Sequence, residues 1–326
     1  MENEIYIGAR DTQTAEQKAL NFKFEEVCRA AGAVNWVEKL RSEWRSFPIR
    51  NQDGSSQCVC MTYSTELGII FKQKYGIFMD FSSCYPYQQR KYPQWGGCTS
   101  EDIYDVFPKL GSLFENYMPS QNIGESACMK VPKLSYYDDL AKTFKVKRIS
   151  LPINFETVAS TIQETGKGVM VWFSFDHSEW TNIPEIKVAN PTGGHSVTAV
   201  DFTLKDGKKY LVIQDSWGLQ YAMNGLRLIS EEYFNARCYS ASYLMTFQTL
   251  DTSDKTITRP KYDGKTIVSF QECMKWEGLF PANVGTMESY GPITRSACVA
   301  FQKRFGLVAD GILGPKTKAK VLSIYN

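Results

Sequence analysis

Residues 52–60 read Gln-Asp-Gly-Ser-Ser-Gln-Cys-Val-Cys and lead into a largely apolar stretch. A turn followed by apolar side chains at helical spacing predicts a helix over 58–75. Ser55 or Ser56 is expected to cap it, because a hydroxyl oxygen can accept a hydrogen bond from a free amide of the first turn. Cys58 would then open the helix, where the helix dipole favours the nucleophilic thiolate form of a cysteine.

His195 is the predicted partner of this thiol. It follows Thr-Gly-Gly and opens an alternating, strand-like run, and an imidazolium group beside a cysteine stabilises its thiolate. Asp215 ends the next predicted strand, across an Asp-Gly hairpin turn, and can hold the imidazole ring. Gln52 lies shortly before Cys58, where its side-chain amide could join the Cys58 backbone N–H in stabilising an oxyanion.

The remaining cysteines and the second histidine have plainer interpretations. Most free cysteines are small buried hydrophobic residues, which is the expectation for Cys28, Cys60, Cys273 and Cys298. Cys60 lies about 200° around the helix from Cys58, so both cannot face His195. Because the cysteines number nine, at least one thiol is unpaired. Two of Cys84, Cys98 and Cys128 could form a disulfide, but the sequence does not determine which two. His177 lies in the polar run Asp-His-Ser-Glu, so we expect it in a solvated loop.

The order of predicted elements gives the fold class. The chain of 326 residues is long enough for two domains with sizeable cores. Helices come first and antiparallel strands second, which is an α+β layout. The expected helices cover 15–40, 58–75, 100–113 and 155–162, and the expected strands cover 169–175, 196–203, 210–215 and 242–249. We divide the chain into a domain over 1–250, a polar linker over 251–264 and a helical domain over 265–326.

Composition excludes several classes of protein. A hydrophobic content of 43% argues against disorder, and 37 Lys+Arg against 35 Asp+Glu leaves no basic excess for nucleic acid. No apolar run reaches the roughly 20 residues that span a membrane. No cysteine pair has the C-x-x-C spacing of a zinc site, so we expect neither a metal nor another cofactor. The first residues are acidic and show no secretory signal, which leaves localisation open: cytoplasmic, wall-associated or carried on a phage-like particle.

Over residues 30–250 the sequence resembles the papain-like cysteine peptidases. The matching motifs are Gln52-Asp-Gly-Ser-Ser-Gln-Cys58, Gly96-Gly97, Gly194-His195 and Asp215-Ser-Trp-Gly218, in that order. The resemblance implies a two-lobed α+β fold with a helical lobe, a β-barrel-like lobe and a cleft between them. It also implies roles for the following residues: Cys58 as nucleophile, His195 as acid and base, Asp215 as the residue orienting His195, Gln52 in the oxyanion hole, Trp217 as a shield of the His195–Asp215 contact, and Gly96 and Gly97 as backbone partners of an extended peptide.

Three positions depart from the family pattern. Asp215 stands where the family usually has asparagine, and a carboxylate favours imidazolium, so we expect activity with a shifted alkaline limit. Val59 replaces the aromatic residue that normally follows the nucleophile. Ser55 replaces a common cysteine, so the family's disulfide from that position is absent. None of these changes removes a group that the chemistry needs.

The C-terminal segment carries an internal repeat. Gly-Pro-Ile-Thr-Arg at 291–295 and Gly-Pro-Lys-Thr-Lys at 314–318 each place proline at a favoured helix start. Together with an earlier helix they predict a three-helix unit, whose expected core residues are Ile267, Phe270, Met274, Ile293, Ala297, Phe301 and Phe305. Residues 301–317, Phe-Gln-Lys-Arg-Phe-Gly-Leu-Val-Ala-Asp-Gly-Ile-Leu-Gly-Pro-Lys-Thr, resemble the peptidoglycan-binding domain 1 family, which implies peptidoglycan as a partner.

The sequence therefore indicates a cysteine peptidase with a cell-wall-binding module. Its substrate is a protein or peptide, and cleavage of proteins and cleavage of peptidoglycan cross-links both remain open. The helical module could instead bind a protein or the cleft of its own peptidase. A non-enzymatic alternative is a wall-binding or virion-associated structural protein with an inactive papain-like fold.

Overall fold

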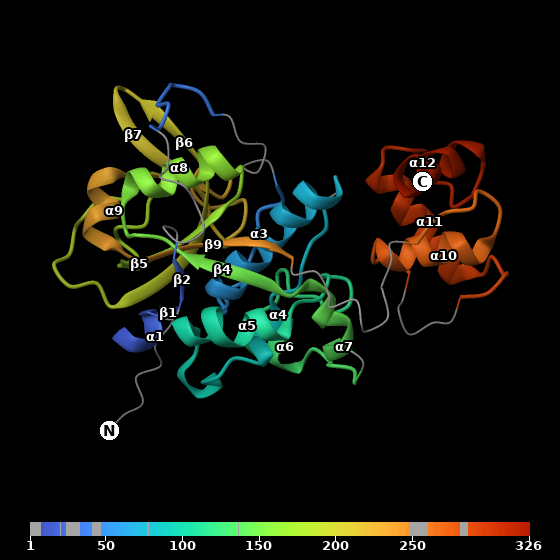
Figure 1. Cartoon of the computed structure of the whole chain (residues 1–326), viewed down its shortest axis with the longest axis horizontal. Helices are drawn as coiled ribbons and strands as arrows, with labels where there is room; N and C mark the ends of the chain where they lie inside the picture. Colours follow the sequence, from blue (N-terminus) through green and yellow to red (C-terminus); the bar gives the residue numbers. More distant parts are fainter. Residues whose placement is uncertain are drawn as a thin grey trace. The chain divides into compact units, whose positions relative to one another are not determined.

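The chain forms two compact units, Met1–Gln248 and Thr249–Asn326, in a computed structural model (Figure 1). The structure describes residues 8–19, 21–23, 33–40, 47–76, 78–135, 137–247, 260–280 and 286–326. No helix within these ranges is both long and apolar enough to cross a membrane. The two units are described separately below.

Helix α3 (Cys58–Tyr75) confirms the first predicted helix. It begins at Cys58 and ends at Gly76, whose φ of 76° is a left-handed conformation that glycine adopts without strain. Gln57 precedes the first helical residue and supplies no side-chain cap. The predicted serine cap is wrong, because the Ser55 hydroxyl instead accepts a hydrogen bond from the Gln57 side chain at 2.9 Å.

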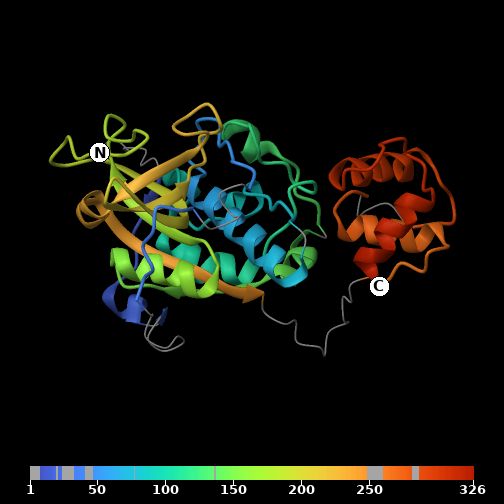
Figure 2. The same cartoon turned by 90° about the horizontal axis from the view of Figure 1, so that it is seen from above.

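A seven-stranded sheet lies beside α3, and Figure 2 shows it from a second direction. Neighbouring strands are antiparallel except at one edge of the sheet, where residues 22–23 pair in parallel with the strand over 146–150. The β6–β7 turn has Asp206 and Gly207 at φ 52° and 72°, as expected of an Asp-Gly hairpin. In spatial order the strands are β2 (Phe22–Lys23), β4 (Val146–Ser150), β9 (Cys238–Phe247), β5 (Val169–Phe175), β6 (Gly193–Lys205), β7 (Lys208–Gln214) and β8 (Leu226–Ser230).

Strand β5 separates two hydrophobic cores. Its alternate residues Met170 and Trp172 join the core that contains α3, while Val171 and Phe173 join a core with α8 (Phe155–Thr165) and α9 (Glu231–Arg237). Side chains alternate across a strand, so a strand buried on both faces is apolar throughout. The continuous apolar run in the sequence therefore marks the strand at the centre of the unit.

Short elements complete the first unit. Strands β1 (Ala9–Arg10) and β3 (Cys98–Thr99) form a separate two-stranded parallel sheet. The predicted helix over 100–113 is broken into a π-helical turn and a four-residue helix with proline in its first turn. The short helical segments are α1 (Ala15–Ala19), α4 (Cys84–Gln88), η2 (Pro93–Trp95), η3 (Asp102–Val106), α5 (Phe107–Leu110), α6 (Glu125–Lys130), α7 (Tyr137–Ala141) and η4 (Lys142–Phe144).

The predicted helix over 15–40 is not continuous: residues 22–23 and 33–40 are not helical, and residues 24–32 lie outside the described residues. Among the described residues of this range only α1 is helical, and residues 22–23 pair with β4. Pairing with a distant strand outweighs a weak local helical pattern, because propensity alone contributes only tenths of a kcal/mol per residue. Cys28 lies outside the described residues, so its burial stays a prediction.

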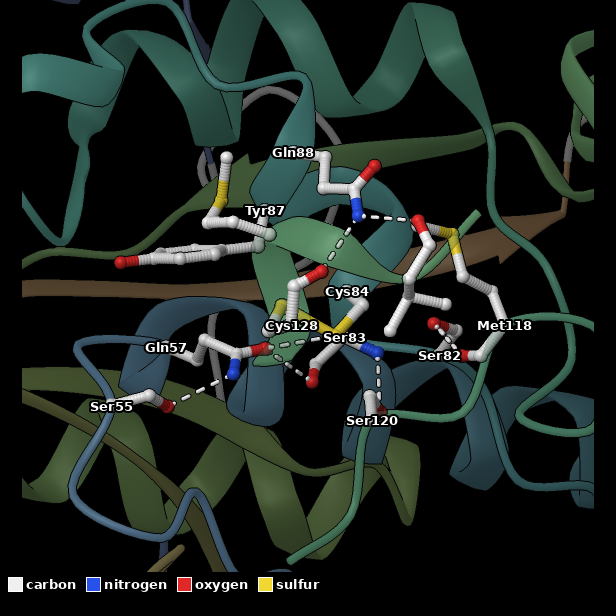
Figure 3. Close-up of a disulfide and its surroundings, with 12 residues drawn as sticks. Ser55, Gln57, Ser82, Ser83, Cys84, Tyr87, Gln88, Met118, Ser120 and Cys128 are labelled. Carbon is white, nitrogen blue, oxygen red and sulfur yellow. Dashed lines mark hydrogen bonds between the residues drawn. A yellow bond between two sulfur atoms is a disulfide. The ribbon is translucent and has the colours of Figure 1, made fainter. Parts of the chain in front are cut away.

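A disulfide joins Cys84 to Cys128 and so links α4 to α6 (Figure 3). Gln57, the residue before α3, lies beside this bond: its side-chain oxygen accepts a hydrogen bond from Ser83 Oγ at 3.0 Å and lies 3.7 Å from the Cys84 sulfur. The disulfide is therefore in contact with the segment that leads into Cys58. One of the pairings that the sequence left open is thereby identified.

The C-terminal unit contains α10 (Ile267–Trp276), α11 (Pro292–Arg304) and α12 (Pro315–Tyr325), as the repeat predicts. Both Gly-Pro pairs open their helices. Phe270, Met274, Ala297 and Phe301 are buried, whereas Ile293 is 43% exposed, so its predicted place in the core is wrong.

The threonine of each repeat replaces Ile293 as the inward-facing residue. Thr294 and Thr317 are buried, and each accepts a hydrogen bond from a buried glutamine, Gln271 at 2.8 Å and Gln302 at 3.1 Å. The repeated Gly-Pro-x-Thr motif thus encodes a helix start together with a buried polar contact.

Candidate active site

Cys58 and His195 line one cavity of about 410 Å³ in the first unit. Cys58 comes from the first turn of α3 and His195 from the start of β6. A hydroxyl bridge joins the two elements nearby: Ser196 Oγ lies 3.1 Å from Thr62 Oγ1, and Thr62 donates to the Cys58 carbonyl at 2.8 Å. The other lining residues are Gly8, Asn51, Gln52, Asp53, Gly54, Ser55, Ser56, Phe175, His177, Gly194, Trp217, Gln220 and Tyr221.

Asp215 holds the histidine ring. His195 Nε2 lies 2.8 Å from Asp215 Oδ1, and both side chains are buried. Burial lowers the pKa of His195, but the charge and hydrogen bond of Asp215 and a hydrogen bond with the Cys58 thiol raise it to about 9. Burial raises the pKa of Asp215, yet His195 and Arg227 together hold it below its usual range. The site therefore favours an aspartate anion beside an imidazolium.

Two further residues contact Asp215, and the sequence analysis missed both. Trp180 Nε1 donates to Oδ2 at 2.9 Å, and Arg227 Nε donates to the same oxygen at 2.8 Å. The Arg227 guanidinium also donates from Nη1 to the carbonyls of Trp180 and Thr181. Arg227 lies on β8 opposite Ile213 of β7, so only the strand pairing brings it to the site.

Aromatic rings surround His195. The rings of Trp217, Trp180 and Phe175 have centroids 5.2, 5.3 and 5.4 Å from the imidazole. They limit water around the His195–Asp215 contact, which strengthens the interaction of the two charges. His177 is exposed, as predicted for a loop, but its ring stacks on Trp217 at 5.5 Å and borders the same cavity.

Gln52 reaches the cavity from the turn before α3. Its backbone N–H donates to the Ser216 carbonyl at 2.8 Å and its Oε1 accepts from Ser216 Oγ at 2.6 Å. Its Nε2 donates one hydrogen bond, to the Ser55 carbonyl. A side-chain amide has two N–H donors, so the second hydrogen remains for a ligand.

Gly96 and Gly97 do not line the cavity. Gly97 lies against residues 8–12 of the same chain, which we call the N-terminal segment. A Cβ on Gly97 would come 1.8 Å from the Gly8 carbonyl oxygen, and that oxygen accepts from Cys98 N at 3.0 Å. On its other side Gly8 meets β6, since a Cβ there would come 1.5 Å from the Gly194 oxygen. Gly97 thus lies against the Gly8 carbonyl, and β1 pairs with β3, which follows Gly97 directly. The binding of an extended peptide by Gly96 and Gly97 stays a prediction.

Further contacts fix this segment. Tyr239 Oη donates to the Ala9 carbonyl at 2.9 Å, and Thr12 N donates to Ser100 Oγ at 2.8 Å. The carbonyls of Gly8 and Ala9 therefore both accept hydrogen bonds from other parts of the unit, and these bonds hold the segment at the cavity wall that Gly8 lines.

The cavity brings together side chains of the types that thiol chemistry uses. A thiol at a helix start, an imidazole fixed by a carboxylate and an amide donor are the groups that acyl transfer to cysteine requires. In the described part of the chain, no group of three or more His, Cys, Asp and Glu side chains could hold a metal ion.

Comparison with solved structures identifies the fold of this unit. The chain is similar to xylellain, a cysteine protease from Xylella fastidiosa, with a TM-score of 0.54 and 16% identity over 66% of this chain and 92% of that chain. It is also similar to digestive procathepsin L 3 of Tenebrio molitor larval midgut, with a TM-score of 0.51 and 17% identity over 69% of this chain and 73% of that one. At these identities the likeness defines the fold, which is the two-lobed α+β fold of papain-like cysteine proteases.

Sequence comparison identifies the C-terminal module. Residues 264–321 match the family described as "Putative peptidoglycan binding domain". A relative from Bacillus licheniformis, "Probable N-acetylmuramoyl-L-alanine amidase", is 33% identical over 99 residues. That match covers 29% of this chain and 28% of the relative, so the chain spans little more than a quarter of that protein's length.

Proposed function

We propose that the protein is a cysteine peptidase that hydrolyses peptide bonds through Cys58, His195 and Asp215 and that its C-terminal module directs it to peptidoglycan. The observation that carries the proposal is the buried His195–Asp215 contact of 2.8 Å beside the cavity that Cys58 lines. The domain division follows the same assignment, with a catalytic domain over 1–250, a linker over 251–264 and a binding module over 265–326.

The proposed reaction begins with an ion pair. Asp215 bonds His195 Nε2, which leaves Nδ1 to take the proton of Cys58. The thiolate attacks the carbonyl carbon of the scissile bond, and the Cys58 backbone N–H and the second Nε2 hydrogen of Gln52 stabilise the oxyanion. His195 then donates its proton to the leaving amine, and a thioester remains on Cys58.

Hydrolysis of the thioester completes the cycle. Neutral His195 takes a proton from water, the resulting hydroxide attacks the acyl carbon, and the carboxylic acid product leaves as the thiolate–imidazolium pair re-forms. Asp215 keeps the ring oriented and stabilises its charged form throughout. Trp217 contributes by covering the His195–Asp215 contact.

The substrate class follows from the module. Residues 264–321 match a family named for peptidoglycan binding, and the relative from Bacillus licheniformis is named "Probable N-acetylmuramoyl-L-alanine amidase". A weak anchor on a polymer raises the local concentration of the bonds around it. We therefore favour peptides of peptidoglycan as substrate, with proteins near the wall as the second candidate.

Replacement of the nucleophile tests the assignment. Cys58→Ala should abolish hydrolysis and labelling of that residue by iodoacetamide. Cys60→Ala, two positions along the same helix and facing away from the cavity, is the matched control and should keep both. Full activity in Cys58→Ala would refute the catalytic role.

A pair of assays separates the substrates. Clearing of purified sacculi with release of free amino groups supports the peptidoglycan peptide, whereas hydrolysis of casein alone supports a protein substrate. Binding to sacculi with neither hydrolysis nor alkylation of Cys58 would instead support a wall-binding structural protein.

A further inference from the structure

Cys60 and Cys98 form a pair of thiols outside the catalytic cavity. Their sulfur atoms lie 3.4 Å apart, and both side chains are buried. Cys60 lies in the first turn of α3, on the side away from the cavity, and Cys98 opens β3. Neither residue lines the cavity that contains Cys58.

The surroundings of the pair disfavour the thiolate form of both residues in the folded protein. Burial raises the pKa of Cys60, and burial and the neighbouring Cys60 raise the pKa of Cys98 well above its usual value. Asp102 adds to this effect at both sulfurs, while Arg90 opposes it. Protonated, solvent-excluded thiols react slowly with oxidants or alkylating reagents in the folded protein.

We propose that Cys60 and Cys98 are the site of a second disulfide, formed while the chain folds under oxidising conditions. One thiolate attacks a low-molecular-weight disulfide such as oxidised glutathione and releases one thiol, giving a mixed disulfide. The second thiolate then attacks the protein sulfur of that mixed disulfide and releases the second thiol. Two protein thiols lose two protons and two electrons, and one small disulfide is reduced to two thiols.

The position of this bond gives it two consequences. It would tie the helix that carries Cys58 to β3, whose Cys98 N–H holds the Gly8 carbonyl of the N-terminal segment. It would also remove Cys60 as a competing partner, so that Cys58 stays a free thiol. The Cys84–Cys128 disulfide lies in the same unit, so one oxidising environment serves both bonds.

Peptide mapping tests the proposal without an activity assay. The Cys58→Ala variant is refolded in a glutathione redox buffer or in dithiothreitol, then alkylated under denaturing conditions and digested with trypsin without reduction. In this variant Cys60 is the only cysteine between Arg50 and Lys72. We expect the oxidised sample to contain a cross-link between the Cys60 peptide and the Cys98 peptide, absent from the reduced sample.

Internal controls make the outcome decisive. The Cys84–Cys128 cross-link should appear in the same oxidised sample, and Cys238 and Cys298 should be alkylated in both samples. Alkylated Cys60 and Cys98 in a sample that contains the Cys84–Cys128 cross-link overturn the proposal. So does a cross-link of either residue to a different cysteine.

Thermal unfolding provides a second measurement. Oxidative refolding should raise the unfolding midpoint of the wild-type chain by roughly 5 °C more than that of Cys98→Ala, because closing a loop restricts the unfolded chain. Both proteins keep Cys84 and Cys128, so the contribution of that disulfide cancels. Equal shifts in the two proteins contradict a Cys60–Cys98 bond.

Discussion

Arg227 Nε lies 2.8 Å from Asp215 Oδ2, and both side chains are buried. Asp215 is thus placed between two cationic side chains, with His195 on its other oxygen. A buried carboxylate with two charged partners is held as an anion, and this anion is what keeps His195 protonated. The strand pairing of β7 with β8 therefore contributes directly to the state of the proposed catalytic histidine.

Arg227→Met should destabilise the first unit by about 3–5 kcal/mol, because it leaves Asp215 with one cation and leaves two buried carbonyls without their donor. Urea unfolding followed by tryptophan fluorescence measures the loss. The exposed residue Lys208 on β7 provides the control, since Lys208→Met should change the unfolding free energy by less than about 0.5 kcal/mol. A loss below 1 kcal/mol for Arg227→Met contradicts the structural role of the pair.

The proposed hydrolysis should have an alkaline limit near pH 9, where His195 loses the proton that the leaving amine receives. Asp215→Asn removes the negative charge that raises the His195 pKa, so the alkaline limit should move toward the usual histidine value of about 6.5. The rate at which iodoacetate alkylates Cys58 measures the same limit without any substrate, because the imidazolium attracts this anionic reagent and its rate falls as His195 loses the proton. An unchanged limit in Asp215→Asn would show that another group sets it.

The same pKa shift predicts a loss of stability at alkaline pH. The folded pKa of His195 is raised, so its stabilising contribution is fully present below about pH 6.5 and disappears as pH rises through about 9. Urea unfolding at pH 6 and pH 9.5 should show a larger decrease for the wild type than for Asp215→Asn. Equal decreases in the two proteins contradict this account.

The N-terminal segment should limit access to Cys58. A Cβ on Gly8 would collide with the Gly194 oxygen at 1.5 Å, so Gly8→Ala should displace the segment. Overpacking of this kind costs about 1–3 kcal/mol, which corresponds to roughly a five- to 150-fold faster reaction of Cys58 with a bulky peptidyl alkylating reagent.

Two controls accompany this experiment. Iodoacetamide is small, so its rate should change much less than that of the peptidyl reagent. Gly124→Ala is the matched variant, because a Cβ there has its nearest neighbour at 3.6 Å. Equal rates for Gly8→Ala and Gly124→Ala would mean that the segment does not restrict the cavity.

Local sequence patterns predicted the elements that carry the proposed site. Helix α3 has a largely apolar pattern and strand β6 an alternating one, and the expected positions of Cys58 and His195 near the starts of these elements follow from those patterns. Trp180 and Arg227 could not be found in this way, because each reaches Asp215 only after distant segments pair. The helix prediction at residues 22–23 was wrong for the same reason, because their strand partner β4 is remote in sequence.

Gln302 should be essential to the C-terminal unit. Its Nε2 donates to Asp310 Oδ1 at 2.8 Å, to the Ile312 carbonyl at 3.0 Å and to Thr317 Oγ1, while its Oε1 accepts from Gly311 N at 2.8 Å. Gln302→Leu keeps a similar volume but removes these hydrogen bonds and leaves the buried Gly311 N–H without its acceptor, at a cost of about 1–3 kcal/mol.

The expected result is a destabilised module in which the loop before α12 loses its anchor. Differential scanning calorimetry of the full chain measures the module's transition, and a sacculus pull-down measures its binding. Lys303→Leu introduces the same residue at the next, exposed position and should leave both unchanged. If Gln302→Leu retains the wild-type midpoint, the glutamine network does not hold this loop; if the midpoint falls while sacculus binding persists, the loop does not carry the proposed binding.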